Sequence, residues 1–269
     1  MQLPILRTLA LVTVGNAVLR KRDAGGFWPN DPMFRYTASL DFMTPRENGN
    51  LAHAAAGPDV WFKKLASRGC TGLRMHSAPM RHDPKLGAIP EHKLVGMVGG
   101  GPRWLIEPVY GDHSELWEGF DRVGDKDAAD KKIWLTAYVL IGEAQSAPKV
   151  DADIRGASLD LRAALTAIEK VARSMPDAPF ADAFAGARAA LEGKGGAPPP
   201  DFVRFTALKP EAVRLLQAAG GAWVFGAMGS WNDLSPDAAL KPRYQQTSKD
   251  LFVALQRAVL VVANSTYGR

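Results

Sequence analysis

Cysteine is almost absent from this chain, because Cys70 is the only one among 269 residues. A single thiol can form neither an internal disulfide nor a zinc site built from several cysteines. This scarcity is typical of proteins from a reducing compartment, and we expect a cytoplasmic protein. Histidine is also scarce, and its spacings match no metal-ligand pattern. The five are His53, His76, His82, His92 and His113. We therefore expect no metal site.

The short motifs of phosphate binding and of nucleophilic catalysis are missing as well. The run Gly99-Gly100-Gly101 is followed by Pro102 and an apolar stretch typical of a strand, whereas a phosphate-binding loop opens a helix. There is no Gly-Lys-Ser/Thr sequence and no G-x-S-x-G elbow. Adjacent Asp112, His113 and Ser114 form no triad, since a triad is assembled by folding. The sequence therefore predicts no bound cofactor.

Excess charge of one sign and a membrane-spanning apolar run are lacking too. Lys and Arg outnumber Asp and Glu by 33 to 28, and the one tight basic cluster, Arg20-Lys21-Arg22, is no basic stripe. This argues against nucleic-acid binding. The apolar stretch from Leu3 to Leu19 is interrupted by Arg7 and Asn16, and no clear cleavage site follows it. We therefore expect neither a secretory signal nor a membrane anchor.

What the sequence does have is the composition of a globular protein, with 46% hydrophobic and 23% charged residues. Its first half is rich in strand patterns, the clearest being a strict alternation of apolar and polar residues over 34–42. The acidic region around 112–130 is mostly loop-like. The expected strands are 9–14, 34–42, 71–76, 93–98, 103–109 and 133–141, the last of them central. One helix, beginning at Pro58 and ending before Gly69, lies among them.

The second half changes to helical spacing after Pro148. We expect four helices there, and the last long one places a stripe from Tyr244 to Val262 on one face. Strands followed by helices predict an α+β fold, with C-terminal helices packed on a largely antiparallel sheet. No long flexible linker separates the halves, so we expect one compact domain over residues 1–269.

Loop positions supply the candidate site residues. Trp28, Trp117 and Trp231 fall in predicted loops, where a tryptophan ring loses little entropy on binding a partner. The segment 229–233 also contains Asn232 and Asp233, directly after an apolar stretch. Whether it meets the similar segment 27–32 in space is open.

Two hypotheses of function follow. In the first, an accessory or partner-binding protein uses loop aromatics as an interface to another protein. In the second, a metal-independent enzyme acts on a small polar substrate, with His76 or Asp233 as acid/base and Arg74 or Asn232 orienting the substrate. His76 qualifies because it ends a predicted strand, where a carboxylate could orient its ring.

Overall fold

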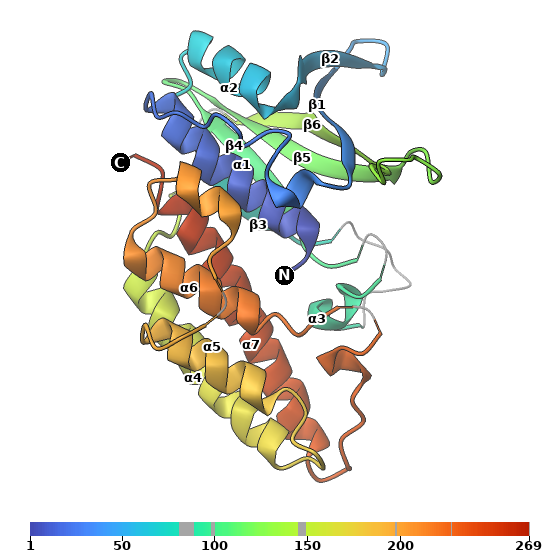
Figure 1. Cartoon of the computed structure of the whole chain (residues 1–269), viewed down its shortest axis with the longest axis vertical. Coiled ribbons are helices and arrows are strands. Elements are labelled where there is room, and N and C mark those ends of the chain that lie inside the picture. The colour runs from blue at the N-terminus through green and yellow to red at the C-terminus, as the bar shows by residue number, and fades with distance from the viewer. Residues whose placement is uncertain (81–88, 98–99, 145–148, 197, 227, 269) are drawn as a thin grey trace.

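The chain folds around one mixed sheet with the strand order β2-β1-β6-β5-β4-β3. The computed structural model describes residues 1–80, 89–97, 100–144, 149–196, 198–226 and 228–268 (Figure 1). Within them the strands are β1 (Thr37–Pro45), β2 (Leu51–Ala56), β3 (Gly72–Ala78), β4 (Arg103–Val109), β5 (Ser114–Val123) and β6 (Trp134–Ala144). Among the strand pairs of the described residues, only β1–β6 is parallel. The predicted largely antiparallel sheet, with β6 inside it, is confirmed.

Helices make up most of the second half, so the predicted α+β class is also confirmed. The α-helices are α1 (Leu3–Leu19), α2 (Gly57–Ser67), α3 (Glu91–Leu94), α4 (Ile154–Arg173), α5 (Ala181–Leu191), α6 (Pro210–Gly221) and α7 (Lys241–Asn264). Short 3₁₀ helices are η1 (Pro32–Phe34), η2 (Asp201–Phe205) and η3 (Trp231–Asp233). No helix among the described residues combines the length and apolarity needed to cross a bilayer.

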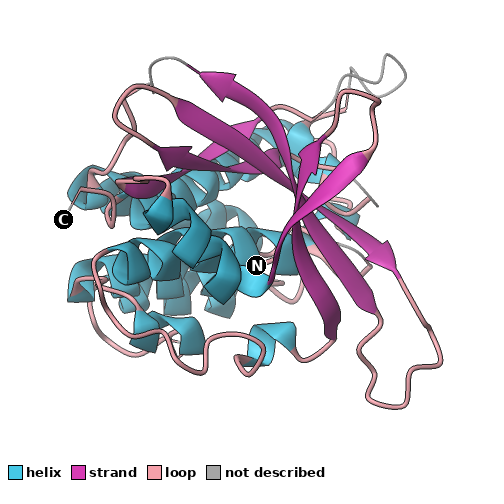
Figure 2. Cartoon of the chain, turned by 90° about the horizontal axis from the view of Figure 1, so that it is seen from above, coloured by secondary structure: helices cyan, strands magenta, loops and turns pink. Residues whose placement is uncertain are grey.

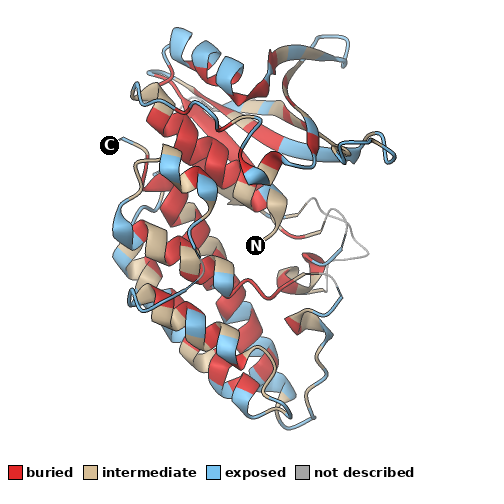
Figure 3. Cartoon of the chain, in the orientation of Figure 1, coloured by how far each residue is buried: buried red, intermediate tan, exposed pale blue. Residues whose placement is uncertain are grey.

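The N-terminal apolar segment was predicted as a strand and is instead helix α1. It is buried from Ile5 to Ala17 with the single exception of Leu6 (Figure 3). A helix enclosed on all sides needs no polar face, so its sequence shows no helical periodicity. The two polar residues that interrupt the apolar run, Arg7 and Asn16, are buried too and make hydrogen bonds inside the protein. The strand prediction was therefore wrong.

Three other local predictions were wrong. The region 114–123, read as part of an acidic loop, is strand β5, because Glu115, Glu118 and Asp121 each have an arginine partner. The segment expected as the strand 93–98 contains the end of α3, whereas the expected strand 103–109 is β4; residues 98–99 lie outside the described residues. Strand β1 begins at Thr37, after η1 and a turn, rather than at Phe34.

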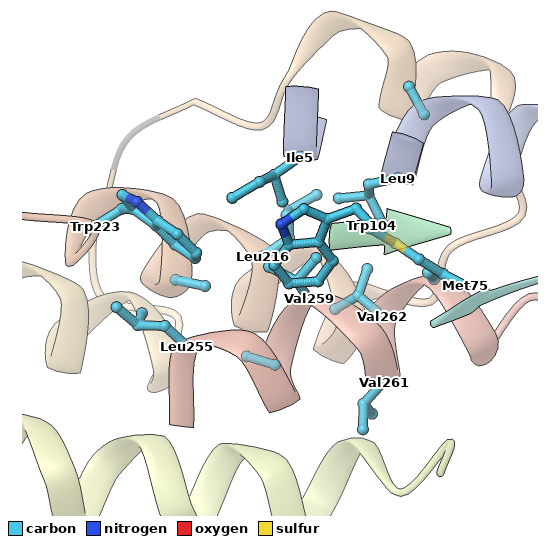
Figure 4. Packing of buried hydrophobic residues seen from close by; sticks show 14 of the residues in the cluster. Ile5, Leu9, Met75, Trp104, Leu216, Trp223, Leu255, Val259, Val261 and Val262 are labelled. Atoms are coloured by element: carbon cyan, nitrogen blue, oxygen red, sulfur yellow. The ribbon is translucent and has the colours of Figure 1, made fainter. Parts of the chain in front are cut away.

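Helices α1 and α2 cover one face of the sheet. On that face Trp61 of α2 stacks on Phe42 of β1, with ring centroids 4.1 Å apart, and Phe42 in turn stacks on Tyr138 of β6. The buried cluster continues past α1 into the C-terminal helices, where Trp104 of β4 lies among Ile5, Leu9, Met75 and Val262 (Figure 4). Figure 2 shows the helices gathered on one side of the twisted sheet.

Strand β3, at one edge of the sheet, is closed by two asparagine side chains. Asn16 of α1 donates to the Leu73 carbonyl at 2.8 Å and accepts from the Leu73 N–H at 2.7 Å. Asn264 of α7 makes the same pair of bonds to Met75, at 3.0 and 2.8 Å. Each side-chain amide takes the place of a neighbouring strand, so the edge-facing backbone groups of Leu73 and Met75 are satisfied.

Replacing Asn264 with the similarly sized leucine should strongly destabilise the protein. The change leaves the Met75 N–H and C=O buried without partners, which costs about 2–4 kcal/mol in the free energy of unfolding. Urea denaturation followed by circular dichroism measures this, with Asn48→Leu in the exposed β1–β2 turn as the control. A loss below about 0.5 kcal/mol, the usual range of surface changes, would contradict the role given to Asn264.

Candidate functional site

Two of the three tryptophans expected on exposed loops are core residues. Trp117 lies on β5 with 1% of its surface exposed, and its Nε1 donates to Glu115. Trp231 is fully buried in η3, where its Nε1 donates to Ser248 at 2.7 Å and its ring stacks on Tyr244. Their placement at the surface was therefore wrong, because each buried ring finds a polar partner for its N–H.

Trp28 keeps part of its ring at the surface and packs edge-on against Phe34, with centroids 4.9 Å apart. The loop around it contacts η2 through Phe27 and Phe205, whereas Trp231 packs on α5 and α7. The three tryptophans thus do not gather into one exposed patch. No recorded ring contact or hydrogen bond joins the described residues of segments 27–32 and 229–233.

Asn232 and Asp233 have local structural roles in the described structure. Asp233 and Ser230 form a capping box for η3, in which the Ser230 N–H donates to Asp233 at 3.0 Å. Asn232 donates to the backbone carbonyl of His92 in α3 at 2.8 Å. None of the hydrogen bonds of these two side chains within the described structure reaches His76, so the structure does not bring the two candidate acid/base residues together.

His76 does have the carboxylate partner that its predicted role requires. Across the β3–β4 ladder Arg74 faces Glu107, and His76 lies two residues further along β3 on the same side. Glu107 is 1% exposed, and its Oε2 lies 2.5 Å from His76 Nε2 and 3.0 Å from Arg74 Nε. A carboxylate only accepts hydrogen bonds, so Nε2 carries the proton. Arg74, Glu107 and His76 form a cluster that we call the Glu107 cluster.

The partners of Glu107 favour its ionised form. Burial by itself raises the pKa of the Glu107 carboxyl, but the hydrogen bond from His76 and the positive charge of Arg74 outweigh it and hold this pKa below its ordinary value. The His76 side chain remains 21% exposed, so one part of the imidazole stays open to solvent. This arrangement orients an imidazole and can support proton transfer.

Sequence reasoning missed Glu107 because it stands inside an apolar run. The signal was nevertheless present: in 103–109, Trp104, Ile106 and Pro108 alternate with Arg103, Leu105 and Glu107, and a charge inside a strand calls for a partner. Pro108 has no N–H to donate to a neighbouring strand. The pairing of β4 with β5 is interrupted there, between Ile106 and Val109.

A second feature on the same face of the sheet is a hollow of 290 Å³ over β2, β1, β6 and β5. The register runs from His76 through Leu105, Glu118, Val139 and Met43, so the Glu107 cluster and the hollow share this face. We call the part of this face that lies over β2, β1, β6 and β5 the open face. The hollow in it is lined by Ser39, Asp41, Met43, Leu51, Phe120, Asp121, Arg122, Leu135, Thr136 and Ala137.

Other chemistry-bearing groups give no further site. Burial raises the pKa of the Cys70 thiol to about 11, so it is not an activated nucleophile. The described residues contain no group of three His, Cys, Asp or Glu placed to hold a metal ion. No protein-family model matches the chain, and neither a curated protein nor a solved structure matches it significantly.

His92, whose backbone carbonyl accepts from Asn232, is 3% exposed, and its ring packs against both Phe225 and Phe252. Its Nε2 has no hydrogen-bond partner among the residues that the structure describes. Burial, helped by the charge of Lys93, lowers the pKa of His92 from 6.5 to about 4. The folded protein therefore holds this imidazole neutral over a range in which the unfolded chain protonates it.

This burial makes stability depend on pH. A histidine whose folded-state pKa is lowered contributes fully above its unfolded pKa, and the contribution falls as the pH drops from about 6.5 toward about 4. At pH 5 the wild type should have lost about 2 kcal/mol relative to a non-titrating His92→Phe variant, compared with their difference at pH 8. Urea denaturation of both proteins from pH 8 to 5 measures this, and parallel curves would contradict it.

Proposed function

We propose that this protein acts by binding a protein partner through the open face of its sheet. The observation that carries the proposal is the hollow, whose lining comes from four strands and includes Met43, Leu51, Phe120, Leu135 and Ala137. Phe120 is 41% and Leu51 46% exposed to solvent. Covering such an apolar surface releases water from it and favours association.

The proposal keeps the partner-binding hypothesis but moves the interface from the loops to the sheet. Two of the three tryptophans that were predicted on loops are buried in the core, whereas the ring of Phe120 is accessible to solvent. Most of the apolar side chains of the open face are half-buried, so a partner orders few flexible groups when it binds. The cytoplasm remains the proposed compartment, supported by the low cysteine content.

The proposal is tested by native mass spectrometry of the untagged protein, gently purified from its own cells. We expect a complex with a second polypeptide, and we expect Phe120→Asp to abolish it because a charge in the hollow opposes burial. Val253→Asp is the matched control, since Val253 is 56% exposed but lies on α7. A bare monomer for the wild type, or equal loss in both variants, argues against the open face as the interface.

A second candidate function is an acid/base enzyme that uses the Glu107 cluster, favoured by the 2.5 Å contact between His76 and Glu107. His76 would transfer the proton, Glu107 would orient its ring, and Arg74 would hold the Glu107 carboxylate in place. The substrate would be a small polar molecule that reaches the exposed part of the imidazole.

This second proposal predicts turnover by the wild type on a panel of simple carboxylic and phosphoric esters. His76→Gln should lower kcat/KM on the responding compound by about 10²-fold or more, the usual contribution of a positioned acid/base group. Glu107→Gln should lower kcat while leaving KM nearly unchanged, since Glu107 acts through His76. Equal rates for the wild type and His76→Gln would exclude His76 as the acid/base.

A further inference from the structure

The carboxylates around the hollow each have a hydrogen-bond or ion-pair partner within the protein. Asp41 lies 3.0 Å from His53 Nε2. Asp121 pairs with the buried Arg7 at 2.6 Å. The Thr136 hydroxyl accepts a hydrogen bond from Arg7 and donates one to Asp121. The neighbouring Glu118 pairs with Arg103 at 2.6 Å. Two of these three carboxylates, Asp121 and Glu118, are therefore compensated by an arginine.

Arg122 differs from these groups. It lines the hollow from β5, is exposed, and forms no ion pair with any residue that the structure describes. It faces Leu135 across the β5–β6 ladder, while Phe120, two residues before it, faces Ala137. Residues two apart on a strand point to the same side and are separated by about 7 Å. A guanidinium therefore stands directly beside the apolar part of the hollow.

We infer that the open face recognises a carboxylate set next to an apolar side chain of a protein partner, with Arg122 binding the carboxylate. This inference rests on the proposed function and names the chemistry of its partner. The guanidinium offers a planar fork of donors that matches a carboxylate, and the adjacent apolar residues receive the neighbouring side chain. Arg122 is the one lysine or arginine among the residues that line the hollow, so one negative group is matched.

The shape of the hollow favours a protein over a free fatty acid. A fatty acid gains most of its affinity when a cavity removes its whole chain from water. The hollow of 290 Å³ lies on an uncovered sheet face and is open to solvent. It accommodates one or two side chains, and the body of a partner then covers the rest of the face.

The inference is tested with two short peptides, acetyl-Leu-Glu-Leu-amide and acetyl-Leu-Gln-Leu-amide, titrated into the full-length protein. Amide NMR shifts report the site and the dissociation constant. We expect shifts in β5 and β6, with the Glu peptide bound about 5- to 10-fold more tightly than the Gln peptide, as for a charge-assisted hydrogen bond at an exposed site. Arg122→Gln should abolish that difference. Arg243→Gln, an exposed arginine on α7, should preserve it.

Three outcomes would overturn the inference. The two peptides could bind equally, the shifts could map away from the hollow, or octanoate could bind more tightly than the Glu peptide, which would assign the site to a free acid. The proposed function fails separately. If Phe120→Asp abolishes the native complex while Arg122→Gln keeps it at full strength, the interface stands and the carboxylate anchor does not.

Discussion

The hydrogen bonds of Asn16 and Asn264 to strand β3 are the constraint on which the rest of the structure depends. They join the edge of the sheet to the first helix and to the last one, so both ends of the chain are fixed at the same strand. Asn16 also donates to Thr266 at 2.8 Å, which links α1 to the segment after α7. Buried backbone groups tolerate few alternatives, so these two amides set the position of the sheet relative to the helices.

This attachment determines which surfaces remain free. Because α1 and α2 cover one face of the sheet and the asparagines close its β3 edge, the surface that stays accessible is the part of the opposite face over β2, β1, β6 and β5. The Glu107 cluster lies toward one end of that face and the hollow toward the other, linked by the register from β3 to β1. Both proposed functions therefore use one face of the sheet, and the intervening Arg103–Glu118 pair separates an ionic region from an apolar one.

Prediction from the sequence succeeded for helices that bury one face and expose the other, because the spacing of their apolar residues indicates the buried face. Helices α2, α4, α6 and α7 are half-buried, and their apolar spacing showed it. It failed for α1, which is enclosed on all sides, and for β5, whose carboxylates are paired with arginines from α1, from the C-cap of α2 and from β4. Of the candidate site, His76 and Arg74 were found from their position on a strand. Glu107 and Arg122 were not, since their importance depends on partners, or the lack of them, far away in the chain.

The sequence by itself determined the class of the fold, the concentration of strands in the first half and of helices in the second, and the absence of the known nucleotide and nucleophile motifs. These follow from composition and local periodicity, which do not depend on long-range contacts. Only the tertiary structure decided which tryptophans are buried, which carboxylate meets His76 and which face of the sheet stays open. Those outcomes depend on contacts between residues separated by many positions, such as Asn16 with Leu73 and Asn264 with Met75, which no local pattern encodes.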